Sequence, residues 1–246
     1  MNDTDLIEGR NSVLELLKSG KDINKLYVQR GERHGSINEI LTLAKEKKIV
    51  IVEVEKQKLD QMSETKNHQG VIASVPPFEY VEVEDILNYA KEKNEDPFIV
   101  MLDEIEDPHN LGSIIRTAEC CGVHGIIIPK RRAASVNMTA NKSSAGAAQY
   151  MRVSRVNNLN DTIRFLKENN VWIYGTEMNG AVDYNEQDYS GGCCLVIGNE
   201  GSGMERMVKE NCDVLVKIPM VGKINSLNAS VSAGIVMYEI FNQRKK

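Results

Sequence analysis

Short apolar runs alternate with segments of helical periodicity through residues 98–246, and this alternation limits the possible folds most strongly. Strands are predicted at Phe98–Leu102, Gly125–Ile128, Val171–Gly175, Cys194–Ile197 and Val214–Ile218. Helices are predicted at Leu111–Cys121, Thr139–Ala147, Leu159–Glu168, Met204–Glu210 and Ser226–Asn242. Because the strands are apolar almost continuously, both of their faces must be buried. The pattern therefore predicts an α/β fold with a Rossmann-like parallel sheet covered by helices on both sides.

A second, smaller α/β pattern precedes this region. It has predicted strands at Lys25–Val28, Ile49–Glu53 and Gly70–Val75 and predicted helices at Gly9–Ser19, Ser36–Lys47 and Glu55–Met62. Pro76 and Pro77 interrupt regular structure, and an acidic segment with one predicted helix, Val83–Glu92, follows. A chain of 246 residues is long for one domain. We predict an N-terminal domain over 1–76, a linker over 77–97 and a C-terminal domain over 98–246.

Composition excludes several classes of protein. The chain is 41% hydrophobic, which is enough for a core, but no apolar run approaches the roughly 18 residues of a membrane span. The first residues lack the basic and apolar regions of a secretory signal, so we expect a cytoplasmic protein with no membrane partner. Five cysteines and four histidines are scattered without metal-ligand spacing. We therefore predict small, buried, reduced thiols and no metal site.

The distribution of charge matters more than the net charge of −5. Residues 77–107 carry eleven acidic and two basic side chains, and residues 1–76 carry twelve of each sign. Residues 108–246 carry sixteen basic and twelve acidic side chains, a net charge of +4. The acidity is thus concentrated around the linker, and the rest of the chain can still present a phosphate-binding surface.

Two glycine-containing stretches follow predicted strands. The run Ile218–Val231 leaves one strand through Pro219, crosses a polar loop and enters a helix with slim first turns; its apolar residues Leu227, Val231, Ile235, Tyr238 and Phe241 recur at helical spacing. The run Leu195–Met204 takes another strand into Gly-Asn-Glu-Gly-Ser-Gly. It matches neither a dinucleotide fingerprint nor a P-loop. Taken singly, each run also fits an ordinary strand, turn and helix.

A third stretch, Asp107–Glu119, completes a set of motifs. Together with the other two, in this order and spacing, it resembles the three motifs of the SpoU (TrmH-type) RNA ribose 2′-O-methyltransferases. Further matches are Gly-Val-His-Gly at 122–125, Ser-Ala-Gly-Ala-Ala at 144–148 and His-Gln-Gly at 68–70. The resemblance covers nearly the whole chain and is closest to the RlmB-like branch, which modifies large-subunit ribosomal RNA.

The resemblance implies S-adenosylmethionine as cofactor and a SPOUT-type sheet with a deep C-terminal trefoil knot. The pattern alone would not have predicted a knot. Glycine lets backbone groups approach a flat ligand edge, at the carboxyl ends of strands where ligands of open α/β sheets bind. The implied cofactor-binding residues are Thr176, Glu177, Met178, Gly198, Asn199, Gly201, Ile218, Met220, Ser226 and Leu227.

The implied catalytic residues are Arg116, Asn110, Glu200, Ser226 and Asn228. Family precedent gives the arginine a catalytic role, sometimes as the base that removes the 2′-hydroxyl proton. Guanidinium groups stay protonated in proteins and offer no acceptor, so a forked donor to the adjacent phosphate and developing alkoxide is physically easier. A capping Asn110 and a surface Arg116 are the ordinary alternative. Glu200 is expected to organise the loop or the substrate.

The resemblance makes residues 1–76 an RNA-binding domain similar to a ribosomal protein L30e-like fold. The candidate RNA contacts are Arg10, Arg30, Arg33, His68, Gln69, Lys130, Arg131, Arg132 and Lys142. Each cation could instead be an ordinary solvated surface charge. The basic run 130–132 follows a strand end, which favours phosphate contact.

The resulting function hypothesis is ribose 2′-O-methylation of RNA by a homodimer, with a guanosine of 23S ribosomal RNA as the leading substrate. A transfer-RNA ribose is the runner-up. A non-catalytic RNA-binding factor of ribosome assembly is a further alternative, which the intact set of catalytic candidates disfavours. A nucleotide-dependent oxidoreductase lacks its glycine fingerprint and its ribose-binding acid.

Overall fold

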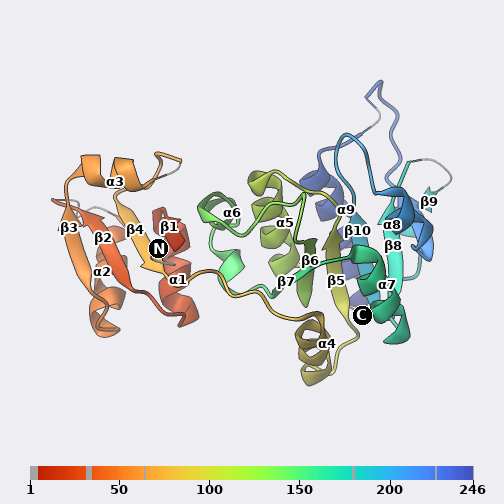
Figure 1. Ribbon diagram of the computed structural model, residues 1–246, viewed down its shortest axis with the longest axis horizontal. Coiled ribbons are helices and arrows are strands. Elements are labelled where there is room, and N and C mark those ends of the chain that lie inside the picture. The colour runs from red at the N-terminus through yellow and green to blue at the C-terminus, as the bar shows by residue number, and fades with distance from the viewer. Residues whose placement is uncertain (1–4, 32–34, 64, 179–180, 225, 246) are drawn as a thin grey trace. The chain divides into compact units, whose positions relative to one another are not determined.

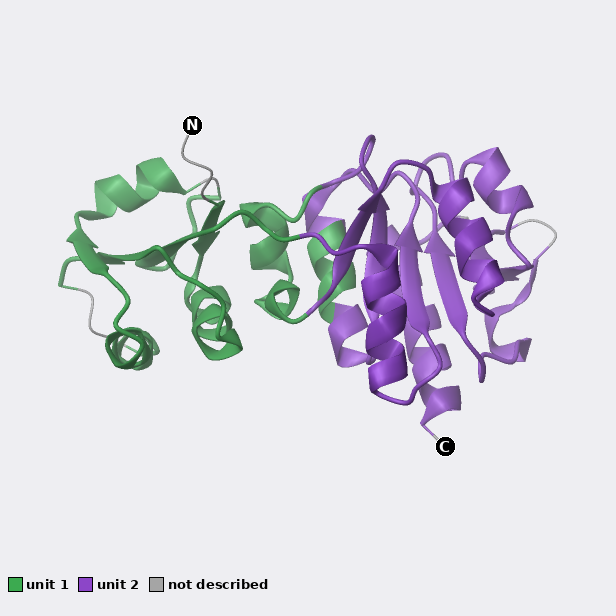
Figure 2. Cartoon of the chain, turned by 60° about the horizontal axis from the view of Figure 1, so that its bottom comes forward, with its two compact units in different colours: residues 1–79, 111–116, 135–150 green, residues 80–110, 117–134, 151–246 purple. Residues whose placement is uncertain are grey.

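The computed structural model describes residues 5–31, 35–63, 65–178, 181–224 and 226–245. The chain forms two compact units, coloured separately in Figure 2. The first comprises residues 1–79, 111–116 and 135–150. The second comprises residues 80–110, 117–134 and 151–246.

The first unit is built on a four-stranded mixed sheet in the order β1-β4-β2-β3. Its elements are β1 (Asp5–Glu8), α1 (Arg10–Ser19), β2 (Lys25–Gln29), α2 (Ile37–Glu46), β3 (Ile51–Val54), α3 (Lys56–Met62) and β4 (Val71–Val75), with α6 (Met138–Ser143) and a 3-10 turn at Ala147–Gln149. Apolar residues of α1 and α2 bury one face of the sheet, and Figure 1 shows α3 on the side opposite α2. Gly20, in the left-handed conformation, ends α1.

The second unit is built on a seven-stranded sheet in the order β7-β6-β5-β10-β8-β11-β9. Every strand pair in it is parallel. Its strands are β5 (Phe98–Leu102), β6 (Gly125–Pro129), β7 (Val153–Val156), β8 (Trp172–Thr176), β9 (Val182–Asp183), β10 (Cys193–Ile197) and β11 (Val214–Lys217). Its helices are α4 (Val83–Glu92), α7 (Leu159–Glu168), α8 (Arg206–Glu210) and α9 (Ala229–Arg244), with a 3-10 turn at Tyr184–Glu186; α5 (Pro108–Cys120) runs through both units.

Both faces of the parallel sheet are covered, as the sequence predicted (Figure 2). Alternate strand residues such as Ile99, Met101 and Val196 join a core cluster with α4, α7 and α8. On α9, Ala233 and Val236 are fully buried. A Cβ added at Gly234 would stand 3.7 Å from the methyl group of Thr117 on α5. The slim residues therefore bring α9 close to α5.

The structure corrects several boundaries. The sequence missed β1, β7 and β9 because they are short and, in β1 and β7, mix apolar with polar residues. The predicted helix Thr139–Ala147 ends at Ser143, because Ala145 and Gly146 have positive φ. The last helix begins at Ala229 rather than Ser226, since Asn228 has an extended conformation and caps it.

The apolar stripe predicted on the last helix is not its buried face. The buried residues of α9 are Ala229, Ala233, Val236, Met237 and Ile240. Val231 and Tyr238, from the predicted stripe, are exposed. The helix is thus apolar around most of its circumference, which leaves an apolar surface uncovered within one chain.

Cys121, Cys193 and Cys194 are buried thiols as expected, but Cys120 is exposed. Burial raises the pKa of Cys121 to about 11 and that of Cys193 to about 12. Among the described residues, no group of three or more His, Cys, Asp or Glu side chains is arranged to hold a metal ion. The described helices include none that is long and apolar enough to cross a membrane.

Candidate active site

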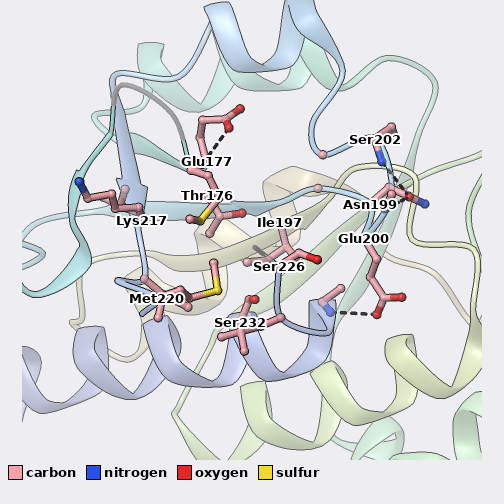
Figure 3. Close-up of a pocket in the computed structure, with 18 residues that line it drawn as sticks. Thr176, Glu177, Ile197, Asn199, Glu200, Ser202, Lys217, Met220, Ser226 and Ser232 are labelled. Atoms are coloured by element: carbon pink, nitrogen blue, oxygen red, sulfur yellow. Dashed lines mark hydrogen bonds between the residues drawn. The ribbon is translucent and has the colours of Figure 1, made fainter. Parts of the chain in front are cut away.

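A cavity of about 360 Å³ opens at the carboxyl ends of β8, β10 and β11 (Figure 3). Its lining includes all ten residues predicted to bind the cofactor: Thr176, Glu177, Met178, Gly198, Asn199, Gly201, Ile218, Met220, Ser226 and Leu227. The other lining residues are Ile197, Glu200, Ser202, Gly203, Val216, Lys217, Ala229 and Ser232. Most of these additional residues adjoin predicted ones in sequence; Ser232, one helical turn beyond Asn228, had no signal of its own.

The glycine loop, residues 198–205, forms one wall of the cavity. The backbones of Asn199 and Gly203 exchange two hydrogen bonds of 3.0 and 2.8 Å, which close the loop on itself. A Cβ at Gly198 would stand 2.4 Å from backbone atoms of Gly203 and Met204, so only glycine fits there without movement. Asn199 Oδ1 accepts hydrogen bonds from the amides of Gly201 and Ser202. These contacts within the loop close its turn.

The opposite wall comes from the end of β8. Thr176 Oγ1 donates to the carbonyl of Val196 on the neighbouring strand, over 3.1 Å. Glu177 Oε1 accepts from the amide of Met178, and Glu177 Oε2 lies 2.6 Å from Nζ of Lys209 on α8. These contacts fix the turn that borders the cavity.

At the start of α9, Asn228 has two functions in one side chain. Its Oδ1 accepts from the amides of Ser230 and Val231, at 3.0 and 3.3 Å, which caps the helix. Its Nδ2 donates to Asn110 Oδ1 over 2.9 Å and also to Glu200 Oε1. Because its oxygen caps α9, the Asn228 side chain is held with its NH2 group directed at Asn110 and Glu200.

Three of the predicted catalytic residues meet in one hydrogen-bonded network. Glu200 Oε1 accepts from Asn110 Nδ2 at 3.0 Å, from the Ala229 amide at 3.0 Å and from Asn228 Nδ2. The carboxylate is thus held at the amino end of α9, where the helix dipole favours negative charge (Figure 3). With Oε1 engaged by three donors, Glu200 is organised as an acceptor that fixes its neighbours.

Arg116 and Asn110 lie on the same helix, α5, whose first residue is Pro108 and whose N-cap is Asp107. The ordinary alternative of a capping Asn110 is wrong, because the N-cap is Asp107, which accepts from the amide of His109 at 2.9 Å. Arg116 is exposed. Within the described part of the chain, no side chain pairs with its guanidinium, so it can donate to an external anion.

The predicted RNA-contact cations differ in their surroundings. Lys130 and Arg131 are exposed just after β6, whereas Arg132 pairs with Glu104 at 3.0 Å while staying 75% exposed. Lys142 points inward: its Nζ lies 3.0 Å from Oε1 of the fully buried Glu8 and also donates to Thr65 and Asn67. The Lys142 charge is thus neutralised within the protein.

Two of the N-terminal candidates lie together at the start of α1. Arg10 Nε donates to the Gln69 carbonyl over 2.9 Å, and Gln69 Oε1 accepts from the Arg10 amide. His68 is 4% exposed, its Nδ1 accepts from the Gly70 amide and its Nε2 lies 3.0 Å from Asp60. It therefore supports the turn rather than reaching the surface.

The two remaining candidates lie elsewhere. Arg30 is exposed and pairs with Glu55 at 2.7 Å. Surface ion pairs of this kind contribute little free energy, so Arg30 can leave Glu55 and bind another anion. Arg33 lies outside the described residues.

Comparison with known proteins identifies the family. Residues 97–238 match the model of the SpoU rRNA methylase family, and residues 6–81 match a model described as RNA 2′-O ribose methyltransferase substrate binding. The chain is also 48% identical, over 98% of its length and 96% of the relative, to a protein of Bacillus subtilis named as a TrmH family tRNA/rRNA methyltransferase. The chain belongs to the SpoU rRNA methylase family. The predicted family and enzyme class are confirmed.

Solved structures agree with this assignment. The SpoU methyltransferase AviRb from Streptomyces viridochromogenes, crystallised with S-adenosylmethionine, matches with a TM-score of 0.82 and 25% identity over 99% of this chain and 91% of its own. An S-adenosylmethionine-bound rRNA methyltransferase from Sinorhizobium meliloti matches with a TM-score of 0.81 and 26% identity over 98% and 87%. Members of the family use S-adenosylmethionine, so the expected cofactor is confirmed at family level.

The cavity suits this cofactor chemically. Its volume falls within the roughly 300–1,000 Å³ of small-molecule sites. Glycine backbone and the apolar side chains of Ile197, Ile218 and Leu227 suit a flat adenine, and the carboxylate of Glu200 suits a cationic sulfonium nearby. When bound, the sulfonium supplies an electrophilic methyl group that needs no metal.

Proposed function

We propose that this protein transfers a methyl group from S-adenosylmethionine to a ribose 2′-hydroxyl in RNA, with a guanosine of 23S ribosomal RNA as the leading substrate. One observation carries the proposal. The network of Asn110, Glu200 and Asn228 adjoins the cavity, because Glu200 is both the hub of the network and part of the lining. Glu200 therefore belongs both to the proposed cofactor site and to the network that holds the Asn110 and Asn228 amides, which we propose orient the substrate.

The described residues divide the chemical task between them. The cavity residues predicted to bind S-adenosylmethionine hold the cofactor, and Ser226, in the lining, is within the same site. Asn110 and Asn228, held by Glu200, hydrogen-bond the ribose and orient its 2′-oxygen. Arg116 donates its guanidinium fork to the neighbouring phosphate and to the oxygen as negative charge develops there. The new bond joins the 2′-oxygen to the methyl group as its bond to sulfur breaks, and the 2′-hydroxyl proton is released to solvent water, because Arg116 as a cation offers no acceptor.

RNA binding is proposed for two basic surfaces. In the second unit the exposed run Lys130–Arg131–Arg132 provides cations near the end of β6. In the first unit Arg10, Gln69 and Arg30 are the surface candidates, and His68 acts through the turn that it supports. We assign Lys142 a structural role, because Glu8 already neutralises it. The match of residues 6–81 to a substrate-binding family supports an RNA role for this region.

The substrate class rests on resemblance. The Sinorhizobium meliloti relative, named as an rRNA methyltransferase, covers the first unit as well as the second, which favours ribosomal RNA. The Bacillus subtilis relative is named for both tRNA and rRNA, so transfer RNA is the second candidate. Exposed Val231 and Tyr238 on α9, with exposed Val221 and Ile224 before it, support the predicted homodimer. The trefoil knot, the domain limits at 76 and 97 and the cytoplasmic location stay predictions.

The test is transfer of labelled methyl groups to separated, unmodified RNA classes. We expect label in large-subunit ribosomal RNA that survives alkaline hydrolysis, because a 2′-O-methyl group blocks cleavage of the adjacent phosphodiester. Label in transfer RNA alone would move the assignment to the second candidate. If S-adenosylmethionine binds but no RNA class accepts label, the catalytic proposal is wrong and a binding role in ribosome assembly replaces it.

A further inference from the structure

Asp103 is a buried carboxylate beside the glycine loop, and no motif of the sequence analysis assigned it a role. It follows β5 directly and is 2% exposed. Its Oδ2 accepts a hydrogen bond of 2.6 Å from the amide of Glu205, the last residue before α8. Its own amide donates to the carbonyl of Ile197, the last residue of β10, over 2.8 Å. Asp103 therefore contacts both ends of the loop: Ile197, just before it, and Glu205, its last residue.

The adjacent residue, Glu104, contacts the loop between these points. Its carbonyl accepts from Asn199 Nδ2 over 2.9 Å. Glu104 has a φ of 57°, an uncommon conformation for a residue other than glycine, asparagine or aspartate. Strained backbone of this kind persists only where surrounding contacts require it. Asp103 and Glu104 thus fasten the segment 197–205 at three places.

The fastened loop carries groups from both halves of the site. Gly198, Asn199, Gly201, Ser202 and Gly203 line the cavity. Glu200, in the middle of the loop, holds Asn110 and Asn228. A shift of the loop would therefore move the cavity wall and the substrate-orienting network together.

We propose that Asp103 is a positioning residue that holds the glycine loop in its cofactor-binding shape. It does not line the cavity, and it acts through Glu205 and the loop. The inference rests on the proposed cofactor site. A buried carboxylate is costly to retain, because desolvation disfavours its charge and raises the pKa of Asp103. A neutral side chain could accept the hydrogen bond from the Glu205 amide at a lower desolvation cost. The presence of an acid therefore fits a demand for a strong, charge-assisted acceptor.

The experiment compares Asp103→Ala, Asp103→Asn and a matched control, Asn158→Ala. Asn158 caps α7 in the same unit by accepting from the amide of Asn160 over 2.9 Å, and it does not line the cavity. Its loss should lower the unfolding temperature of the protein without affecting the loop. Calorimetry measures the affinity for S-adenosylhomocysteine, and hydrogen exchange of the protein without ligand measures the protection of the Gly203 and Glu205 amides.

We expect Asp103→Ala to weaken S-adenosylhomocysteine binding about tenfold, since it removes a hydrogen bond to a charged acceptor. Both amides should exchange faster in this variant. Asp103→Asn retains an oxygen acceptor and should lose only about twofold to threefold. Asn158→Ala should bind as the wild type does and exchange normally at both amides, although it unfolds at a lower temperature.

Binding within twofold of wild type in folded Asp103→Ala, with unchanged exchange, would overturn the proposal. If Asp103→Ala does not fold, Asp103→Asn decides: unchanged affinity together with unchanged exchange at Glu205 overturns it. Equal losses of affinity in the Asn158→Ala control would also overturn it, because they would show a general effect of stability. If the wild type itself fails to bind S-adenosylhomocysteine, the cofactor site is wrong. The exchange data then still decide whether Asp103 holds the loop.

Discussion

The side-chain amide of Asn228 donates to the side-chain oxygen of Asn110 over 2.9 Å, although 118 positions separate them in the chain. Each residue also donates to the same oxygen of Glu200. The three motifs that are far apart in sequence are thereby joined by direct contacts between their polar side chains. The orientation of the Asn110 and Asn228 side-chain amides depends on all three.

Substitution of Asn228 should separate its two functions. Asn228→Ser keeps an oxygen that can cap α9 but removes the donor to Asn110 and Glu200. We expect its free energy of unfolding to stay within about 0.5 kcal/mol of wild type, because serine and asparagine cap helices about equally well. Asn228→Ala should cost about 1 kcal/mol more. Methyl transfer should fall about 100-fold in both. Full activity in the serine variant would refute the role of the amide.

Arg116 should be required for catalysis and dispensable for stability. Its side chain is exposed, and no described residue pairs with it. Arg116→Ala should lower the rate of methyl transfer by about 100- to 1,000-fold, the usual loss for one donor to a developing oxyanion. Arg116→Lys should rescue little, because lysine lacks the planar fork. Thermal unfolding and S-adenosylhomocysteine affinity serve as controls and should not change. A lysine variant with near-normal rate would argue against a forked contact.

Sequence reasoning found most of the fold because apolar periodicity decides strands and helices locally. It placed Leu159–Glu168 and Phe98–Leu102 at their observed bounds. It failed at β9, which has two residues and depends on pairing with β11. It also could not tell which side of α9 is buried, since that helix carries apolar residues on several sides.

The site was only partly accessible from sequence. Glycine motifs indicated the loop, and the family resemblance supplied the roles proposed for Arg116 and Asn228. Nothing in the sequence showed that Lys142 is neutralised by Glu8, because the two are 134 positions apart. The burial of His68 was equally hidden, since its polar neighbours in sequence suggested a surface. Long-range polar contacts have no periodic signature.

Two glycines of the loop should differ sharply in their tolerance of alanine. A Cβ at Gly198 would stand 2.4 Å from backbone atoms, whereas one at Gly201 would meet only Asn199 Oδ1 at 3.4 Å. Overpacking against backbone costs about 1–3 kcal/mol, so Gly198→Ala should weaken S-adenosylhomocysteine binding about tenfold or more. Gly201→Ala is the comparison variant and should lose much less affinity, because its Cβ would meet no backbone atom. Calorimetric dissociation constants measure both, and equal affinities would contradict the assigned cavity.

The buried Glu8 should contribute a pH-dependent stability. Burial alone would raise the pKa of Glu8, but hydrogen bonds from Ser63 and Thr65 and the hydrogen bond and charge of Lys142 outweigh it and lower that pKa. The stability from its ionised form is therefore fully present above the ordinary value of 4.5 and is lost as pH falls through the folded-state pKa.

This prediction is checked by comparing wild type with Glu8→Gln in denaturant titrations over a pH range that extends well above and well below the ordinary glutamate pKa of 4.5. The variant should be less stable at neutral pH by about 3 kcal/mol, because the amide leaves Lys142 without its counter-charge. The difference should shrink steadily at acid pH. A difference that stays constant across the range would show that Glu8 is not ionised in the folded protein.

The central claim is tested most directly by identifying the methylated atom. RNA treated with the protein and trideuteromethyl S-adenosylmethionine is digested to nucleosides and measured by mass spectrometry, for wild type and Arg116→Ala. The account predicts a trideuterated 2′-O-methyl ribose, on guanosine of large-subunit ribosomal RNA, that is nearly absent from the variant. A methyl group on a base, or equal yields from both proteins, would contradict the assignment of this site to ribose methylation.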